Sequence, residues 1–209
     1  MFGFNDIIQL IAFVPGILIA MVVHEYAHAR VAVAMGDFTP RMMGRLTLNP
    51  RAHIDWLGLV MLFFAHFGWA KPVVFNPRNF KNWRQGECLV ALAGPFANLL
   101  VAFLALLAFV IYGKLGLSIS AGVFMVVQAV VLININFAIF NLLPLPPLDG
   151  SKVLLVFLPG RWQSELLNLE RYSLIILILL LYVGPVRDIL SWLSGLVLFG
   201  FSTVLSLLF

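Results

Sequence analysis

Long apolar stretches set the first limit on how this chain can fold. One runs from about residue 7 to 23 and continues as a helical pattern to 34; the others are 88–112, 118–143, 172–183 and 189–209. A helix needs about 20 apolar residues to cross a bilayer core of about 30 Å. The 209 residues are 62% hydrophobic and only 11% charged, too few to cover a soluble core. We therefore expect an all-α polytopic membrane protein with about five transmembrane helices.

The same composition excludes other classes of protein. Intrinsic disorder requires low hydrophobicity. The net charge of +4 comes without a basic run, so we expect no nucleic-acid partner and assign the cations to cytoplasmic loops and anionic lipid. A single cysteine, Cys88, excludes an internal disulfide framework and a multi-cysteine zinc site.

We interpret residues 1–209 as one membrane domain, because no linker or repeat divides them. Its core covers about 7–150, and C-terminal helices cover about 172–209. The first apolar stretch lacks a preceding basic segment and runs directly into charged residues, which argues against a removable signal peptide.

Residues 56–69 are apolar but are interpreted as not crossing the membrane. They are few for a span, and the surrounding residues 36–87 are cationic, whereas the loop between the next two helices holds only Lys114. The positive-inside rule places 36–87 in the cytoplasm. We expect a re-entrant or interfacial element here, with short strands or loops at 38–50 and 71–80. The cations are Arg41, Arg45, Arg51, Lys71, Arg78, Lys81 and Arg84.

The first apolar stretch ends in a pattern suited to a metal. His24-Glu25-Tyr26-Ala27-His28 reads H-E-x-x-H. Residues four apart lie on one face of a helix, so both imidazoles can reach one ion, and Glu25 is close enough to take a proton from an activated water. The alternative is a pair of structural histidines beside a chance glutamate. Ionisable groups inside a membrane are costly, which favours the metal site.

A catalytic zinc site needs a third protein ligand. Asp149 is the best candidate, because three prolines end the preceding helix and Gly150 permits unusual backbone angles. With residues 56–69 not crossing, Asp149 emerges on the same side as the histidines. The alternative is a solvated aspartate in a Pro-rich turn. The full set of candidates is His53, Asp55, His66, Glu87 and Asp149.

These residues together resemble the site-2 proteases, which are intramembrane zinc metalloproteases of peptidase family M50. The resemblance covers about residues 15–180 and rests on His24-Glu25-x-x-His28 and Asn141-x-x-Pro144-x-x-Pro147-Leu148-Asp149-Gly150. Gly94-Pro95-x-x-Asn98 is similar to a weaker family element. The stretches 48–55 and 67–72 resemble a compact prokaryotic branch without a PDZ domain. The chain departs from the pattern at Ser151 and Val74.

The resemblance implies a role for each matching residue. His24, His28 and Asp149 would ligate one Zn²⁺, and Glu25 would activate water. Asn141 matches a position thought to hold the oxyanion; the alternative is a residue that caps the carbonyls of its own helix end. Asn98 could form a hydrogen bond across helices. Gly94 is interpreted as permitting close helix packing, and His53 with Asp55 as a structural loop pair or entrance residues.

The expected activity is hydrolysis of peptide bonds in or near transmembrane segments of single-span membrane proteins. We expect a multi-pass protein of the inner (plasma) membrane whose active site faces the cytoplasm. Two alternatives stay open on the residues: a non-proteolytic zinc-binding protein or metal carrier, and a membrane scaffold without a site. The sequence leaves the oligomeric state open.

Overall fold

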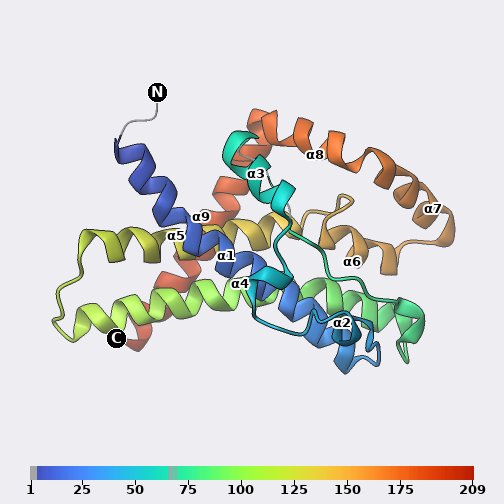
Figure 1. Ribbon diagram of the computed structural model, residues 1–209, viewed down its shortest axis with the longest axis horizontal. Coiled ribbons are helices and arrows are strands. Elements are labelled where there is room, and N and C mark those ends of the chain that lie inside the picture. The colour runs from blue at the N-terminus through green and yellow to red at the C-terminus, as the bar shows by residue number, and fades with distance from the viewer. Residues whose placement is uncertain (1–3, 66–67, 69) are drawn as a thin grey trace.

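The computed structural model describes residues 4–65, 68 and 70–209, and helices dominate it (Figure 1). No strand occurs in these described ranges; a single bridge joins Ile54 to Ala70. The expected all-α fold is therefore confirmed. The α-helices are α1 (Phe4–Ala34), α2 (Thr39–Met42), α3 (Trp56–Ala65), α4 (Trp83–Lys114), α5 (Ala121–Asn141), α6 (Asp149–Phe157), α7 (Gly160–Leu169), α8 (Ser173–Tyr182) and α9 (Gly184–Leu208).

Within the described residues, four helices are long and apolar enough to cross a membrane. They are α1, from Ile11 onward, α4, α5 and α9. The fifth helix expected from the sequence is α8, but it has 10 residues, or about 15 Å at 1.5 Å per residue. That length is about half the thickness of the hydrocarbon core. The last two helices divide at Val183, and α9 begins at Gly184, five residues earlier than the apolar stretch that starts at 189.

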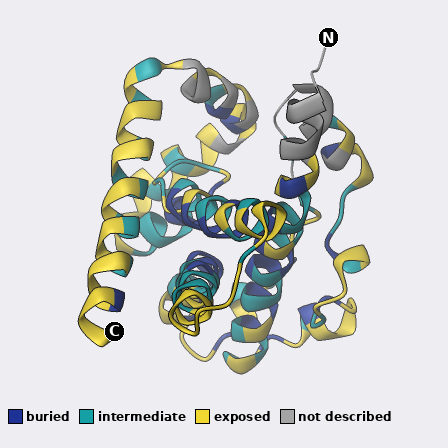
Figure 2. Ribbon diagram, turned by 90° about the vertical axis from the view of Figure 1, so that its left-hand side faces the viewer, coloured by how far each residue is buried: buried dark blue, intermediate teal, exposed yellow. Residues whose placement is uncertain are grey.

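The core lies where α1, α4 and α5 pack against one another, and their mutual contacts are the most extensive in the structure. Buried residues gather along these three helices, whereas α9 is exposed over most of its length (Figure 2). Gly16 of α1 allows a close approach, since a methyl group there would lie 3.1 Å from the Ala129 backbone of α5. Helix packing in membranes depends on such small residues.

The helix ends follow from local sequence. The Ser120 hydroxyl accepts a hydrogen bond from the Val123 backbone N–H, so α5 begins at Ala121, three residues later than the apolar stretch. The loop between α4 and α5 covers residues 115–120, because α4 continues to Lys114. Gly116 then adopts a φ of 69°, a conformation that glycine adopts without the steric cost of a side chain.

Residues 35–55 and 70–82 form loops with short helical turns in place of regular strands. Besides α2, two single turns cover Pro50–Ala52 and Pro77–Asn79. The expected loops are therefore present, and the expected short strands reduce to the one isolated bridge. Helix α3 contains 10 residues, so it is too short to cross the bilayer. The end of the 56–69 stretch, with His66, lies outside the described residues.

Asp37 ties these loops to the end of α1. Its side chain is completely buried, and its carboxylate accepts hydrogen bonds from the Thr39 hydroxyl (2.6 Å), the Asn76 backbone N–H (2.6 Å) and the Asn79 amide (2.8 Å). Burial opposes ionisation, but these donors outweigh it and hold the Asp37 pKa below its ordinary value. The segment before α4 is thereby fixed beside α1.

Candidate metal centre

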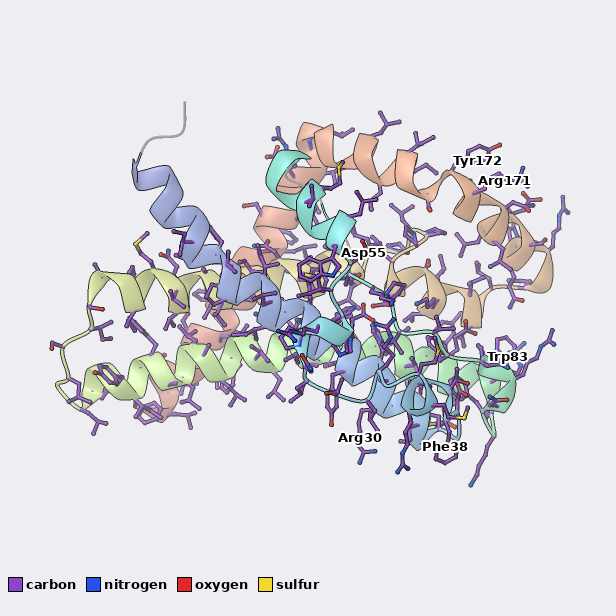
Figure 3. The ribbon with its side chains drawn as sticks, in the orientation of Figure 1. Arg30, Phe38, Asp55, Trp83, Arg171 and Tyr172 are labelled. Atoms are coloured by element: carbon purple, nitrogen blue, oxygen red, sulfur yellow. The ribbon has the colours of Figure 1, made fainter. Side chains whose placement is uncertain are left out.

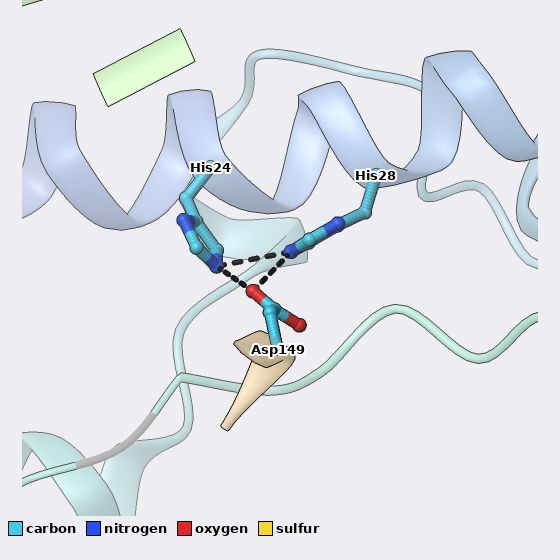
Figure 4. A group of neighbouring side chains, drawn as sticks. All are labelled: His24, His28 and Asp149. Atoms are coloured by element: carbon cyan, nitrogen blue, oxygen red, sulfur yellow. Dashed lines mark hydrogen bonds and ion pairs between the residues drawn. The ribbon is translucent and has the colours of Figure 1, made fainter. Parts of the chain in front are cut away.

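His24 and His28 present their ring nitrogens to Asp149 in the core. The Nε2 atoms of both histidines lie 3.0 Å from Asp149 Oδ2, and 3.0 Å from each other (Figure 4). The three residues are 4%, 6% and 5% exposed, respectively. The two parts of the sequence motif, more than a hundred residues apart, therefore meet at one point. Among the described residues these three form the one group of potential ligands that could hold a metal.

Asp149 reaches this point because α5 stops early and a new helix starts there. Asn141 is the last residue of α5, and the three prolines that follow prevent its continuation. Asp149 is the first residue of α6, which packs against α4. A methyl group at Gly150 would collide with the carbonyl oxygens of Leu142 and Leu143. Glycine therefore allows the start of α6 to fold back onto the end of α5.

Helix α4 forms the wall behind the histidines. Val90, Gly94 and Asn98 are spaced four apart, so they share one face of α4, as His24 and His28 share one face of α1. The Val90 carbonyl lies 2.7 Å from His28 Nδ1, and Asn98 Oδ1 lies 2.8 Å from His24 Nδ1. The Gly94 position is tight: a methyl group there would be 2.6 Å from atoms of both imidazoles.

The arrangement fits a cation with nitrogen and oxygen ligands. A carbonyl only accepts, so His28 Nδ1 carries the hydrogen and Nε2 of the neutral ring presents a lone pair. Asp149 Oδ2 is buried and, within the described part of the chain, has no hydrogen-bond partner. Lone pairs that converge at 3.0 Å repel one another unless a cation lies between them. A point just above the plane of the two Nε2 atoms and Asp149 Oδ2 can lie about 2 Å from all three, as zinc requires.

Glu25 lies beside the ligands and is held by a distant segment. It is 8% exposed, and its Oε2 accepts a hydrogen bond of 2.8 Å from the Val73 backbone N–H. Val73 belongs to residues 71–76, which form neither helix nor strand and which Asp37 secures through Asn76. A carboxylate placed in this way beside a metal can act as a general base.

Comparison with known proteins assigns the family. The sequence model of Peptidase family M50 matches residues 110–183. YwhC of Bacillus subtilis (strain 168) is 36% identical over 180 residues, which are 84% of this chain and 82% of YwhC. The chain belongs to peptidase family M50.

Two further relatives carry the name Rip2. Rip2 of Mycobacterium tuberculosis (strain ATCC 25618 / H37Rv) is 32% identical over 190 residues, which are 88% of this chain and 70% of Rip2. Rip2 of Mycolicibacterium smegmatis is 33% identical over 207 residues, which are 93% of this chain and 75% of Rip2. No solved structure matches the chain significantly.

The names of these relatives describe zinc metalloproteases. The resemblance to the site-2 proteases is thereby confirmed, and the chain is a zinc metalloprotease with Zn²⁺ as its cofactor. Membership of the M50 family favours the protease over the metal carrier and the scaffold. The roles of His24, His28 and Asp149 as ligands stay predictions that the geometry fits.

Asn141 is at the end of α5, and the contact it makes there is local. Its amide donates a 2.9 Å hydrogen bond to the Phe137 carbonyl, one helical turn earlier. Asn134 and Asn136 make the same bond, to the carbonyl four residues earlier, inside α5, so it does not identify a residue that caps the helix end. The role of Asn141 toward the oxyanion in this M50 protein stays a prediction.

Three other candidate ligands, His53, Asp55 and Glu87, lie outside the group of described residues that could hold a metal. His53 is fully buried, with Nε2 2.7 Å from the Thr47 carbonyl. Asp55 accepts hydrogen bonds from the backbone N–H groups of Leu57 and Gly58, and so caps the start of α3. Asp55 lies near the start of α3 in Figure 3. Glu87 is outside the group that could hold a metal, and His66 lies outside the described residues.

Four contacts at the centre were not predicted from the sequence of this M50 chain. Asn98 and Val90 bind the outer nitrogens of the histidines, Val73 binds Glu25, and Lys152 Nζ lies 3.2 Å from Asp149 Oδ1. The signal for the first was present in the sequence as a polar residue within an apolar stretch. The two backbone contacts leave no trace in residue type, because any residue can supply them.

Proposed function

We propose that this M50 protease hydrolyses peptide bonds in or near the transmembrane segments of single-span membrane proteins. One observation carries the proposal: the candidate metal centre is buried among α1, α4 and α5, three of the four helices long enough to span a membrane. A site at such depth is suited to a substrate that arrives through the bilayer. Helical carbonyls are already hydrogen-bonded, so the substrate must unwind before it is cleaved.

Each residue at the metal centre has a separate proposed role. Zinc, when bound, polarises the scissile carbonyl and lowers the pKa of water to about 7. His24, His28 and Asp149 would hold the ion. Glu25 takes a proton from the attacking water and returns it to the leaving amine, while the Val73 N–H keeps its carboxylate in place. Asn141 is proposed to donate a hydrogen bond to the developing oxyanion.

We also propose that the chain lies in the inner (plasma) membrane with the centre facing the cytoplasm. The cations of residues 36–87, together with Lys152, Arg161 and Arg171, precede or follow the ends of α1, α4 and α5 that carry the centre. The opposite ends hold Lys114 alone. Phe38, Trp83 and Arg171 lie on the right of Figure 3, away from the turn that joins α4 to α5. Such a distribution is typical of cytoplasmic loops.

Substitution of the general base tests the proposal. Glu25→Gln in vesicles that contain a single-span substrate should abolish cleavage while one zinc per chain is retained, because the amide cannot accept the proton. Zinc is measured by elemental analysis and cleavage by electrophoresis. Retained turnover would exclude Glu25 as the base.

A matched substrate separates intramembrane cleavage from ordinary proteolysis. The same cleavage sequence is presented once within a transmembrane segment and once as a soluble peptide. Preference for the membrane form supports the proposal. Cleavage of the soluble peptide alone contradicts the proposal. Zinc binding without cleavage of either substrate would support the alternative of a non-proteolytic zinc-binding protein.

A further inference from the structure

Asn98 is placed unusually for a polar residue of an apolar helix. It lies in the middle of α4, its side chain is fully buried, and it contacts the two other core helices. Besides the 2.8 Å contact with His24 Nδ1, its Nδ2 donates to the Ala20 carbonyl of α1 and to Asn134 Oδ1 of α5, both at 2.9 Å. The oxygen and the NH₂ group of the Asn98 amide therefore both have hydrogen-bond partners on α1 or α5.

The partners determine which way the amide of Asn98 points. A backbone carbonyl can only accept, so the NH₂ group must face Ala20. The Asn134 amide is oriented in the same way by its bond to the Val130 carbonyl, 2.8 Å, which leaves Asn134 Oδ1 as a second acceptor for Asn98. The oxygen of Asn98 is therefore the atom that faces His24.

This orientation decides the tautomer of His24. Because Asn98 Oδ1 accepts, Nδ1 of His24 carries the hydrogen, and Nε2 presents its lone pair toward Asp149. The opposite tautomer would place a hydrogen at Nε2, where the metal is expected. We propose that Asn98 is a positioning residue of the zinc site, which fixes the tautomer and ring orientation of His24.

The two histidines provide an internal comparison. His28 is fixed by the Val90 carbonyl, a backbone group that no substitution of a side chain removes. His24 depends on one side chain. Substitution of a group that binds the non-coordinating nitrogen of a metal-ligating histidine typically lowers metal affinity about 10–100-fold. The inference rests on the zinc site of the proposed function but not on the identity of the substrate.

The test measures zinc affinity, by competition with a chromophoric chelator, in the purified full chain. Asn98→Leu removes the acceptor and should weaken zinc binding about 10–100-fold. Asn98→Asp keeps an acceptor for His24 and should stay within about threefold of the wild type, below that range. Asn134→Leu is the matched control, because it removes the bonds of Asn134 to Asn98 and to the Val130 carbonyl and leaves the bond of Asn98 to His24. Its affinity should also stay within about threefold of the wild type, by the same comparison.

A purely structural role predicts a different pattern. Wild-type zinc affinity in Asn98→Leu, or an equal loss in all three variants, would overturn the proposal. Thermal melting of the metal-free proteins shows whether each variant folds. If Asn98→Leu does not fold, the zinc affinities of Asn98→Asp and Asn134→Leu are compared with each other. Weaker zinc binding in Asn98→Asp than in Asn134→Leu overturns the proposal. Weaker zinc binding in Asn134→Leu, or equal and near-wild-type affinity in both, supports it. Zinc affinity is independent of cleavage, so failure here is distinguishable from failure of the proposed proteolysis.

Discussion

Gly94 leaves no room for a side chain between α4 and the two histidines. A methyl group there would lie 2.6 Å from His24 Nδ1 and from His28 Nε2. Gly94→Ala should therefore displace both rings and lower zinc affinity at least tenfold, in the range found when metal-supporting residues are changed. Zinc per chain and melting temperature are the measurements. Gly113→Ala is the control, because it lies in the same helix with open space around it.

Wild-type zinc affinity in Gly94→Ala would show that α1 and α4 can separate without cost, and would contradict the close packing seen here. A loss of equal size in Gly113→Ala would assign the effect to the helix and not to the centre.

At the scale of single residues, the sequence identified those whose chemistry is unusual for a membrane. His24, Glu25, His28 and Asp149 are conspicuous because few residues of the chain ionise. Asn98 was recognised as a residue that could bond across helices, but its contact with His24 was not predicted. That contact depends on the antiparallel register of α1 and α4, which no local pattern encodes. Gly94 was expected to allow packing, and its neighbours turn out to be the two histidines themselves.

At the scale of elements, the loop residues 71–76 should control the position of the Glu25 carboxylate. Val73→Pro removes the N–H that binds Oε2, and a hydrogen bond to a charged group contributes about 1.5–3 kcal/mol. Turnover should fall about 10–100-fold, the equivalent of that free energy, while zinc binding is unchanged. Val74→Pro is the matched control, since it introduces the same ring into the same segment without removing this bond. Equal turnover in the two variants would exclude the positioning of Glu25 by Val73.

The Asp37 carboxylate should set the acid stability of the same segment. Its pKa is lowered from 3.8 by the donors of Thr39, Asn76 and Asn79. A lowered pKa in the folded state means that the stabilisation is complete above pH 3.8 and is lost as the pH falls through the folded value. Asp37→Asn should therefore lower the melting temperature at pH 7, and the difference from wild type should narrow below about pH 4.

Glu165→Gln is the control for this pH series, because Glu165 is an exposed carboxylate of α7. A melting difference that stays constant from pH 7 to pH 3 would show that the charge of Asp37 does not stabilise the fold.

Elements differ in how far their sequence predicts them. The apolar stretches predicted the ends of α1, α4, α5 and α9 to within five residues, because about 20 apolar residues have few alternatives in a bilayer. For residues 35–55 and 70–82, the sequence predicted that loops occur but not the path that they follow. Their course depends on distant hydrogen bonds, such as those of Asp37 to Asn76 and of Glu25 to Val73. Helix α8 was expected to span, but it ends at Tyr182 after 10 residues.

At the scale of the whole molecule, the candidate metal centre restricts the topology. His24 and His28 lie on α1, and Asp149 follows α5, so both parts must reach the same depth. Two spanning helices, α4 and α5, separate them, and α3 is too short to add a third. An even number of crossings returns the chain to the same face. The three candidate ligands can therefore meet only if an even number of helices crosses the membrane between the two parts of the motif.

This topology predicts which loops face the cytoplasm, and labelling of single cysteines can measure it. Cys88→Ala removes the one native thiol. Lys81→Cys, before α4, and Leu115→Cys, after α4, then place exposed thiols at opposite ends of that helix. A membrane-impermeant maleimide should label Lys81→Cys in inside-out vesicles only and Leu115→Cys in intact cells only, because cationic loops stay in the cytoplasm. The reverse pattern would place the centre on the outer face, and labelling of both from one side would contradict α4 as a spanning helix.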